Sequence, residues 1–161
     1  MPPSGHARAA RRRLGTPGKR RDRAPRLTSY RIFISHGGAD VWLASQIASR
    51  LQQCGAITFL DNNDLMKGDD FKQIIREEVG RVDELVALFT PWSMRRNWVW
   101  VEIGAAWVNQ KRIVIVLYQV TLTDLDSGGG RAVLNDLNLV EINDIERYFE
   151  EVKTRVQGMA S

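Results

Sequence analysis

Glu102 is the residue whose neighbours in the sequence most clearly suggest chemistry. It is the charged side chain of the stretch NWVWVEIGAAW (97–107), which otherwise holds three tryptophans, aliphatic residues and small residues. A carboxylate buried among such side chains is costly unless it has a partner. Beside an aromatic wall and partly removed from water, it can stabilise positive charge that develops on a substrate. The same glutamate can also be the polar edge of an ordinary helix, and its spacing alone leaves both interpretations open.

The helix expected over residues 97–110 must position this carboxylate. Trp98 lies four residues before Glu102 and therefore on the same face. Ala105 and Asn109 fall within the same sector of the helix. This face thus has an indole on which a ligand can stack and small side chains that leave room for it.

The opposite side of the same helix is apolar. Trp100, Ile103 and Trp107 lie there, and we expect them to pack against the core. The alternative for the Trp100 and Trp107 surface is contact with another copy of the chain.

The elements around this helix alternate between strands and helices. The expected strands are RIFIS (31–35), AITFL (56–60), ELVALF (84–89), RIVIVLY (112–118) and LVEI (139–142). The expected helices cover 40–54, a stretch around 71–79, 97–110 and a last segment from Ile145 to Val156. The pattern predicts an α/β fold with a doubly wound, five-stranded parallel sheet of flavodoxin-like shape. Ligands of such folds lie outside the carboxyl ends of the strands, which indicates the loops after Ser35, Leu60 and Phe89.

Charge divides the chain into a basic tail and an acidic remainder. Residues 1–29 hold nine Lys and Arg against a single Asp, a net charge of +8, whereas the other 132 residues hold 14 Lys and Arg and 18 Asp and Glu, a net charge of −4. The tail has little to bury, so we expect it to be disordered. Its arginines allow weak contact with nucleic acid or an anionic surface, and no other nucleic-acid binding is expected. The folded domain is expected at 30–157, with disorder again at 158–161.

Composition narrows the remaining possibilities. No apolar run approaches the ~20 residues of a membrane-spanning helix, and no secretory signal is evident, so we expect no membrane insertion. A single cysteine, Cys54, suits a reducing compartment and indicates a cytoplasmic protein. With only His6 and His36 beside it, no metal site is expected.

Four segments together resemble the TIR (Toll/interleukin-1 receptor) domain in its bacterial form. They are RIFISHGGAD, FLDNNDLMKGDDF, FTPWSMRRNWVWVEIGAAW and KRIVIVLY, in that order. The most specific part is WVxxEIG (98–104), followed by the first strand, which ends in Ile34 and Ser35. The loop after Leu60, with Asp61 at its start, resembles the BB loop of the family.

The resemblance implies an activity, because many TIR domains of this type are NAD glycohydrolases. They break the bond between nicotinamide and ribose and give nicotinamide with ADP-ribose or a cyclic ADP-ribose. NAD is then the substrate, and no cofactor or metal is implied. The family's catalytic glutamate matches Glu102. The residues matched to substrate binding are Ser35, His36, Gly37, Asp61 and Trp98.

This chemistry needs only one carboxylate. The nicotinamide nitrogen is cationic and leaves without protonation, and a nearby carboxylate can stabilise the oxocarbenium-like ribose that remains. The resemblance further implies self-association through TIR–TIR contacts that complete the pocket, and a role in signalling or antiphage defence. It leaves room for an upstream sensor protein.

Two other functions also fit the sequence, and two further ones do not. A TIR domain that acts without catalysis, as an interaction module in TIR–TIR assembly, is the main alternative, and a nucleoside deoxyribosyltransferase-like enzyme is a weaker one. A response-regulator receiver needs an aspartate at the end of the third strand, where this sequence has FTP (89–91). A dinucleotide-binding turn needs G-x-G-x-x-G, which SHGGAD (35–40) does not supply.

Overall fold

The computed structural model describes residues 29–60, 77–127 and 137–159. Its strands form one parallel sheet: β1 (Arg31–Ser35), β2 (Ile57–Leu60), β3 (Glu84–Phe89), β4 (Arg112–Leu117) and β5 (Asn138–Glu141). The sheet has five strands in the order β2-β1-β3-β4-β5, which confirms the predicted flavodoxin-like topology. The strand order reverses between β1 and β3, and ligands of this fold bind in the crevice at that point.

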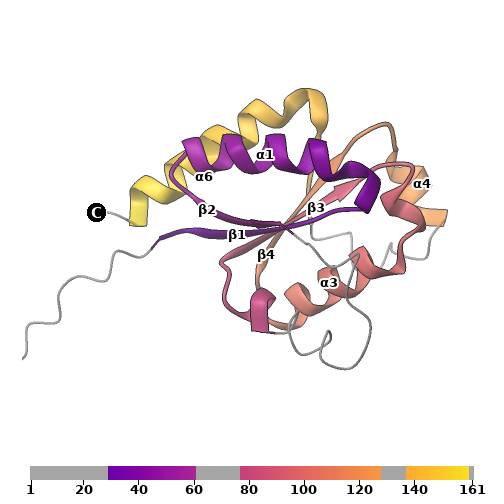
Figure 1. Ribbon diagram of the computed structural model, residues 1–161, viewed down its shortest axis with the longest axis horizontal. Coiled ribbons are helices and arrows are strands. Elements are labelled where there is room, and N and C mark those ends of the chain that lie inside the picture. The colour runs from indigo at the N-terminus through magenta and orange to yellow at the C-terminus, as the bar shows by residue number, and fades with distance from the viewer. Residues whose placement is uncertain (1–28, 61–76, 128–136, 160–161) are drawn as a thin grey trace, which may run out of the picture.

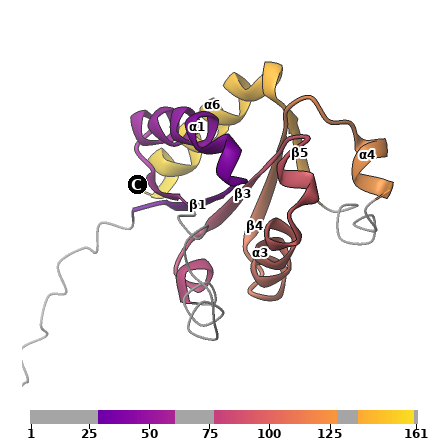
Figure 2. The same cartoon turned by 45° about the vertical axis from the view of Figure 1, so that its right-hand side comes forward.

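Helices cover both faces of the sheet. α1 (Val41–Gln53) and α6 (Ile145–Met159) lie on one face, and α3 (Asn97–Val108) lies on the other (Figures 1 and 2). Side chains of β1 pack alternately against the helices on the two faces of the sheet, because successive residues of a strand point to opposite faces. Ile32 and Ile34 pack with α1 and α6, whereas Phe33 packs with α3.

α1 ends as its sequence predicts. Gly55 follows it with φ +93°, a conformation that glycine adopts without strain. The amide of Gly55 donates to the Gln52 carbonyl at 2.9 Å, and the amide of Ala56 donates to the Leu51 carbonyl at 3.1 Å. This pair of bonds is a Schellman motif, which fixes the turn into β2.

One helix was not predicted from the sequence. α4 (Leu122–Ser127) follows β4 and begins with a reciprocal cap. The Thr121 amide donates to Asp124 Oδ2 at 2.7 Å, and the Asp124 amide faces Thr121 Oγ1 at 3.4 Å. The hydrogen bonds from Thr121 lower the pKa of Asp124. The T-x-x-D spacing of this capping box was the signal that could have revealed the helix.

Some sequence-based predictions concern residues that the structure does not describe, and others differ from it at the ends of elements. The basic tail up to residue 28, the loop with Asp61, and most of the helix expected around 71–79 lie outside the described residues. α6 continues through Met159, whereas we expected disorder from residue 158, because the apolar pattern of the helix stops at Val156. β5 begins and ends one residue earlier than predicted. Among the described residues, no helix is both long and apolar enough to span a membrane.

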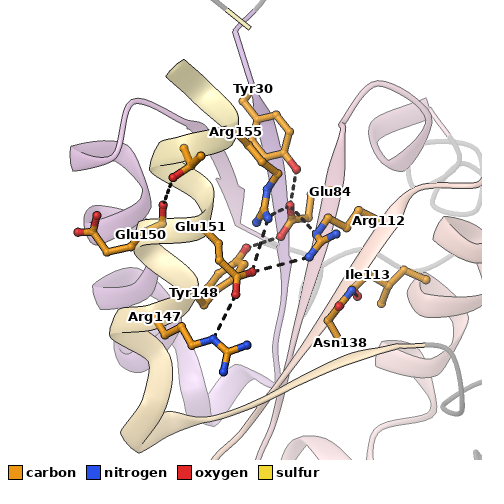
Figure 3. A network of polar contacts seen from close by, with 11 residues as sticks. Tyr30, Glu84, Arg112, Ile113, Asn138, Arg147, Tyr148, Glu150, Glu151 and Arg155 are labelled. Atoms are coloured by element: carbon orange, nitrogen blue, oxygen red, sulfur yellow. Dashed lines mark hydrogen bonds and ion pairs between the residues drawn. The ribbon is translucent and has the colours of Figure 1, made fainter. Parts of the chain in front are cut away.

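A buried carboxylate joins elements at the amino ends of the strands (Figure 3). Glu84, at the start of β3, is 0% exposed. The Tyr148 hydroxyl donates to its Oε1 at 2.5 Å, and the Tyr30 hydroxyl donates to its Oε2. Arg155 Nη2 and Arg112 Nε lie 3.3 Å and 3.6 Å from Oε2. We call these five residues the Glu84 cluster.

The Glu84 cluster perturbs its own tyrosines. Burial raises the pKa of both Tyr30 and Tyr148, and the neighbouring Glu84 carboxylate raises it further. Both hydroxyls therefore stay protonated as donors to the carboxylate over the ordinary pH range. The cluster connects the starts of β1, β3 and β4 to α6, at the opposite end of the sheet from the expected ligand site.

Candidate active site

The carboxyl end of β1 supplies the first group of predicted site residues. Ser35 is 0% exposed and His36 is 8% exposed. Ser35 lies two residues after Phe33 and so faces the layer of α3. Among the described residues its Oγ has no hydrogen-bond partner. His36 Nδ1 donates to the Gly37 carbonyl at 2.9 Å, which fixes the ring close to the backbone.

α3 supplies the second group. Trp98 lies in its first turn and is half-buried, and Glu102 lies one turn later and is 0% exposed. Trp98 Nε1 donates to Glu102 Oε1 at 3.1 Å. The predicted contact between these side chains is confirmed, and the structure decides that Glu102 is buried rather than a solvated edge residue.

The predicted orientation of α3 is wrong in one respect. Its buried residues are Val99, Glu102, Ile103 and Ala106. Trp107, expected in the core, is 61% exposed, and Trp100 is half-buried with its ring 5.0 Å from that of Phe89. α3 is apolar on nearly every side, so the spacing of its apolar residues did not define a single buried face. The helix is turned so that Glu102, not Trp107, points inward.

The loop after β3 connects these two groups. Thr90 is 2% exposed and Ser93 is 0% exposed. Thr90 Oγ1 donates to Asp40 Oδ2 at 2.8 Å and accepts from the amides of Trp92 and Ser93, each at 3.1 Å. Ser93 Oγ accepts from the Thr90 amide at 2.7 Å. Side-chain bonds therefore close the turn and fasten it to the start of α1.

Gly37 allows the loops after β1 and β3 to approach closely. A Cβ atom on Gly37 would lie 3.0 Å from Asp40 Oδ2 and 3.4 Å from the Cα of Ser93. A larger residue would push these groups apart. The position after His36 therefore has little room for any side chain larger than that of glycine.

The chain is similar in sequence and in fold to known proteins. The family model of the TIR domain matches residues 32–153, more than half of the chain. This chain belongs to the TIR domain family. The suspected resemblance is therefore confirmed.

One relative of this TIR domain carries the name of an enzyme. A protein of Brachypodium distachyon, "Probable 2' cyclic ADP-D-ribose synthase BdTIR", is 29% identical over 98 residues. The match covers 60% of this chain and 44% of the relative, so this chain matches less than half of that protein's length.

Solved structures agree on the fold. The TIR domain of the Toll-related receptor TRR-2 from Hydra magnipapillata superposes with a TM-score of 0.56 at 16% identity, covering 83% of this chain and 100% of that one. The CMP N-glycosidase BcmB of Clostridium botulinum superposes with a TM-score of 0.53 at 16% identity, covering 77% and 98%. At such identities the likeness concerns the fold alone.

The outcome for the predicted site residues of this TIR domain is mixed. Trp98 and Glu102 are bonded to one another, and Ser35 faces their layer. His36 and Gly37 lie on the loop that meets Ser93, and Asp61 is outside the described residues. No group of three metal-ligating side chains occurs within the described ranges.

Sequence reasoning missed the connection between Asp40, Thr90 and Ser93. Asp40 was identified only as the start of a helix. The spacing T-x-x-S after a strand is typical of turns closed by hydroxyl groups, and this was the available signal. The contact with Asp40, 50 residues earlier, had no local signal.

Proposed function

We propose that this TIR domain is an NAD glycohydrolase in which Glu102 is the catalytic residue. The observation that carries the proposal is the buried Glu102 carboxylate held by the Trp98 indole in the layer that Ser35 also faces. A family relative whose name is that of a cyclic ADP-ribose synthase adds support for a substrate of this class.

The proposed chemistry begins with breakage of the bond between ribose C1′ and the nicotinamide nitrogen. The bonding electrons go to the nitrogen, and nicotinamide leaves as a neutral molecule. The ribose gains oxocarbenium character, and the Glu102 carboxylate stabilises this positive charge. A water then attacks C1′ and releases a proton to give ADP-ribose, or a hydroxyl of the same molecule attacks to give a cyclic product. NAD is a substrate throughout.

Burial makes Glu102 effective in this role. A fixed carboxylate removed from water interacts with developing charge more strongly than one in bulk solvent, because the effective dielectric constant is lower. The Trp98 indole donates a hydrogen bond to one carboxylate oxygen and so orients it. Ser35 Oγ, without a hydrogen-bond partner among the described residues, is suited to bond a ligand hydroxyl.

The test is direct measurement of nicotinamide release. Purified protein at high concentration is incubated with NAD, and the products are separated by chromatography, with Glu102→Gln in parallel. Glutamine keeps the size of the side chain and removes its charge. We expect release by the parent, a loss of at least roughly hundredfold in the variant, and a product peak that distinguishes ADP-ribose from its cyclic form. Equal release by both proteins would exclude Glu102 as the catalytic residue.

A second candidate function is assembly without catalysis. The outer side of α3 carries Val101, Trp107 and Val108, which are 48%, 61% and 74% exposed. An apolar surface of this kind on a helix suits contact with another protein. Sedimentation of the parent and of Trp107→Glu tests it, because assembly with no nicotinamide release would favour the interaction module. Roles in signalling or antiphage defence are compatible with either function.

A further inference from the structure

The contact between Asp40 and Thr90 lies where the sheet should hold its ligand. Asp40 follows the loop after β1 in the 3-10 turn η1 (Gly38–Asp40), and Thr90 follows β3. These are the two strands between which the order of the sheet reverses. The carboxylate–hydroxyl bond of 2.8 Å therefore spans the crevice position of the fold.

This bond is not needed to hold the two strands together. β1 and β3 already pair through their backbones, from Ile32 opposite Glu84 to Ser35 opposite Ala87. The Asp40–Thr90 bond acts beyond the last pair, on the loops alone. Its effect is thus to fix how the His36–Gly37 segment sits against the turn after β3.

The turn after β3 leads directly into the helix of Glu102. The Met94 amide donates to the Thr90 carbonyl at 3.1 Å, and the Arg96 amide donates to the Ser93 carbonyl at 2.9 Å. The 3-10 turn η3 (Ser93–Arg95) fills this interval, and α3 begins at Asn97. A displacement of Thr90 would therefore be passed through short, bonded backbone to Trp98.

We propose that Asp40, through Thr90, is a positioning residue that sets the distance between the loop after β1 and the Trp98–Glu102 pair. The proposal rests on the proposed function, since the loop after β1 is expected to hold the substrate whose ribose Glu102 acts upon. Misplacement of a reacting group by about 1 Å can cost roughly hundredfold in rate. Loss of the bond should then lower kcat more than it changes KM.

Asp40→Ala is the main variant, because it removes the acceptor and keeps the bonds that Thr90 Oγ1 receives from the turn. We expect kcat to fall roughly ten- to hundredfold, with KM for NAD within about threefold of the parent. Asp40→Asn retains a carbonyl acceptor for Thr90 and should restore most of kcat. Val152→Ala, a cavity variant in the opposite layer, is the control for stability, since Val152 is fully buried away from α3.

A second readout does not depend on turnover. The Trp98 indole N–H is bonded to Glu102, and its hydrogen exchange can be followed by NMR, with Trp98→Phe to assign the resonance. We expect this exchange to be several-fold faster in Asp40→Ala than in the parent and in Val152→Ala.

The outcomes separate the two proposals. If the parent releases no nicotinamide even when concentrated, the proposed function fails, and the indole exchange alone decides the positioning role. If the parent is active, an unchanged kcat in Asp40→Ala overturns the positioning role. A drop in kcat that Val152→Ala reproduces at equal loss of melting temperature also overturns it.

Discussion

Glu84 and Glu102 are both fully buried glutamates, and the surroundings of each carboxylate differ. Glu84 receives hydroxyl hydrogen bonds from Tyr30 and Tyr148 and faces two guanidinium groups, all from other elements. Glu102 accepts from Trp98, one turn earlier on its own helix. The bonds of Glu84 join strands and a helix, whereas the Trp98 bond orients a side chain within one helix. Glu84 thus joins parts of the fold at one end of the sheet, whereas Glu102 in the other layer is the residue to which we assign the proposed chemistry.

The largest expected effect is on stability, from Glu84→Ala. Removing one partner of a buried ion pair leaves the others uncompensated and typically costs about 3–5 kcal/mol. Here the tyrosine hydroxyls and the Arg112 and Arg155 guanidiniums would lose their common acceptor. Urea unfolding measures the change, with the exposed Glu78→Ala as the matched control. A loss below about 1 kcal/mol, the size of an ordinary hydrogen bond, would contradict the structural role of Glu84.

Trp98→Phe should have the next largest effect, and on activity. It removes the indole donor to Glu102, and a hydrogen bond to a charged group is worth about 1.5–3 kcal/mol. That energy corresponds to a loss of kcat/KM of roughly ten- to hundredfold. Nicotinamide release under steady-state conditions measures it. Trp92→Phe, at a position 67% exposed, is the control, and an equal loss in both variants would argue against the Trp98–Glu102 bond.

Alkaline pH should lower the stability that the Glu84 cluster gives to the fold. The pKa of Tyr148 is raised in the folded state, so the unfolded chain loses this proton first as pH rises. The free energy of unfolding should therefore fall above about pH 10, by about 1.4 kcal/mol per pH unit for each such tyrosine. Urea unfolding between pH 9 and pH 11 tests this, and Tyr148→Phe should show a shallower fall. Identical slopes in parent and variant would show that Tyr148 is not responsible.

The smallest expected effect concerns a surface pair. Arg50 Nη2 lies 2.6 Å from Glu146 Oε2, but their side chains are 49% and 70% exposed. Pairs in solvent contribute about 0.2–1 kcal/mol, because water and salt screen them. A double-mutant cycle of Arg50→Ala and Glu146→Ala in urea should therefore give a coupling well below the cost of Glu84→Ala. A coupling energy as large as the cost of Glu84→Ala would show that burial is not what makes the interactions of Glu84 strong.

Local patterns predicted the sheet well and the site in part. RIFIS and ELVALF are short apolar runs with polar neighbours, and each became a strand with the predicted bounds. The Trp98–Glu102 contact followed from helical spacing alone. Non-local contacts had no such signal: Tyr148 meets Glu84 across 64 residues, and Thr90 meets Asp40 across 50.

The spacing of apolar residues in α3 also could not predict which side of this helix is buried. This helix carries apolar residues on nearly every side. Which of them are buried therefore depends on the neighbouring strands and not on the spacing of the apolar residues. Packing against the sheet selected Val99, Ile103 and Ala106 and left Trp107 outside. α6, by contrast, is amphipathic, and the residues that it buries, Tyr148, Phe149 and Val152, lie on its one apolar face.

The most direct test of the division between the two glutamates compares Glu84→Gln with Glu102→Gln in one set of measurements. Both variants remove a buried charge and keep the side-chain size. Nicotinamide release from NAD and urea unfolding are recorded for each. The account predicts that Glu102→Gln stays folded and loses release, whereas Glu84→Gln is markedly less stable and its folded fraction keeps the parental turnover. Retained release in Glu102→Gln, together with a loss of stability like that of Glu84→Gln, would contradict it.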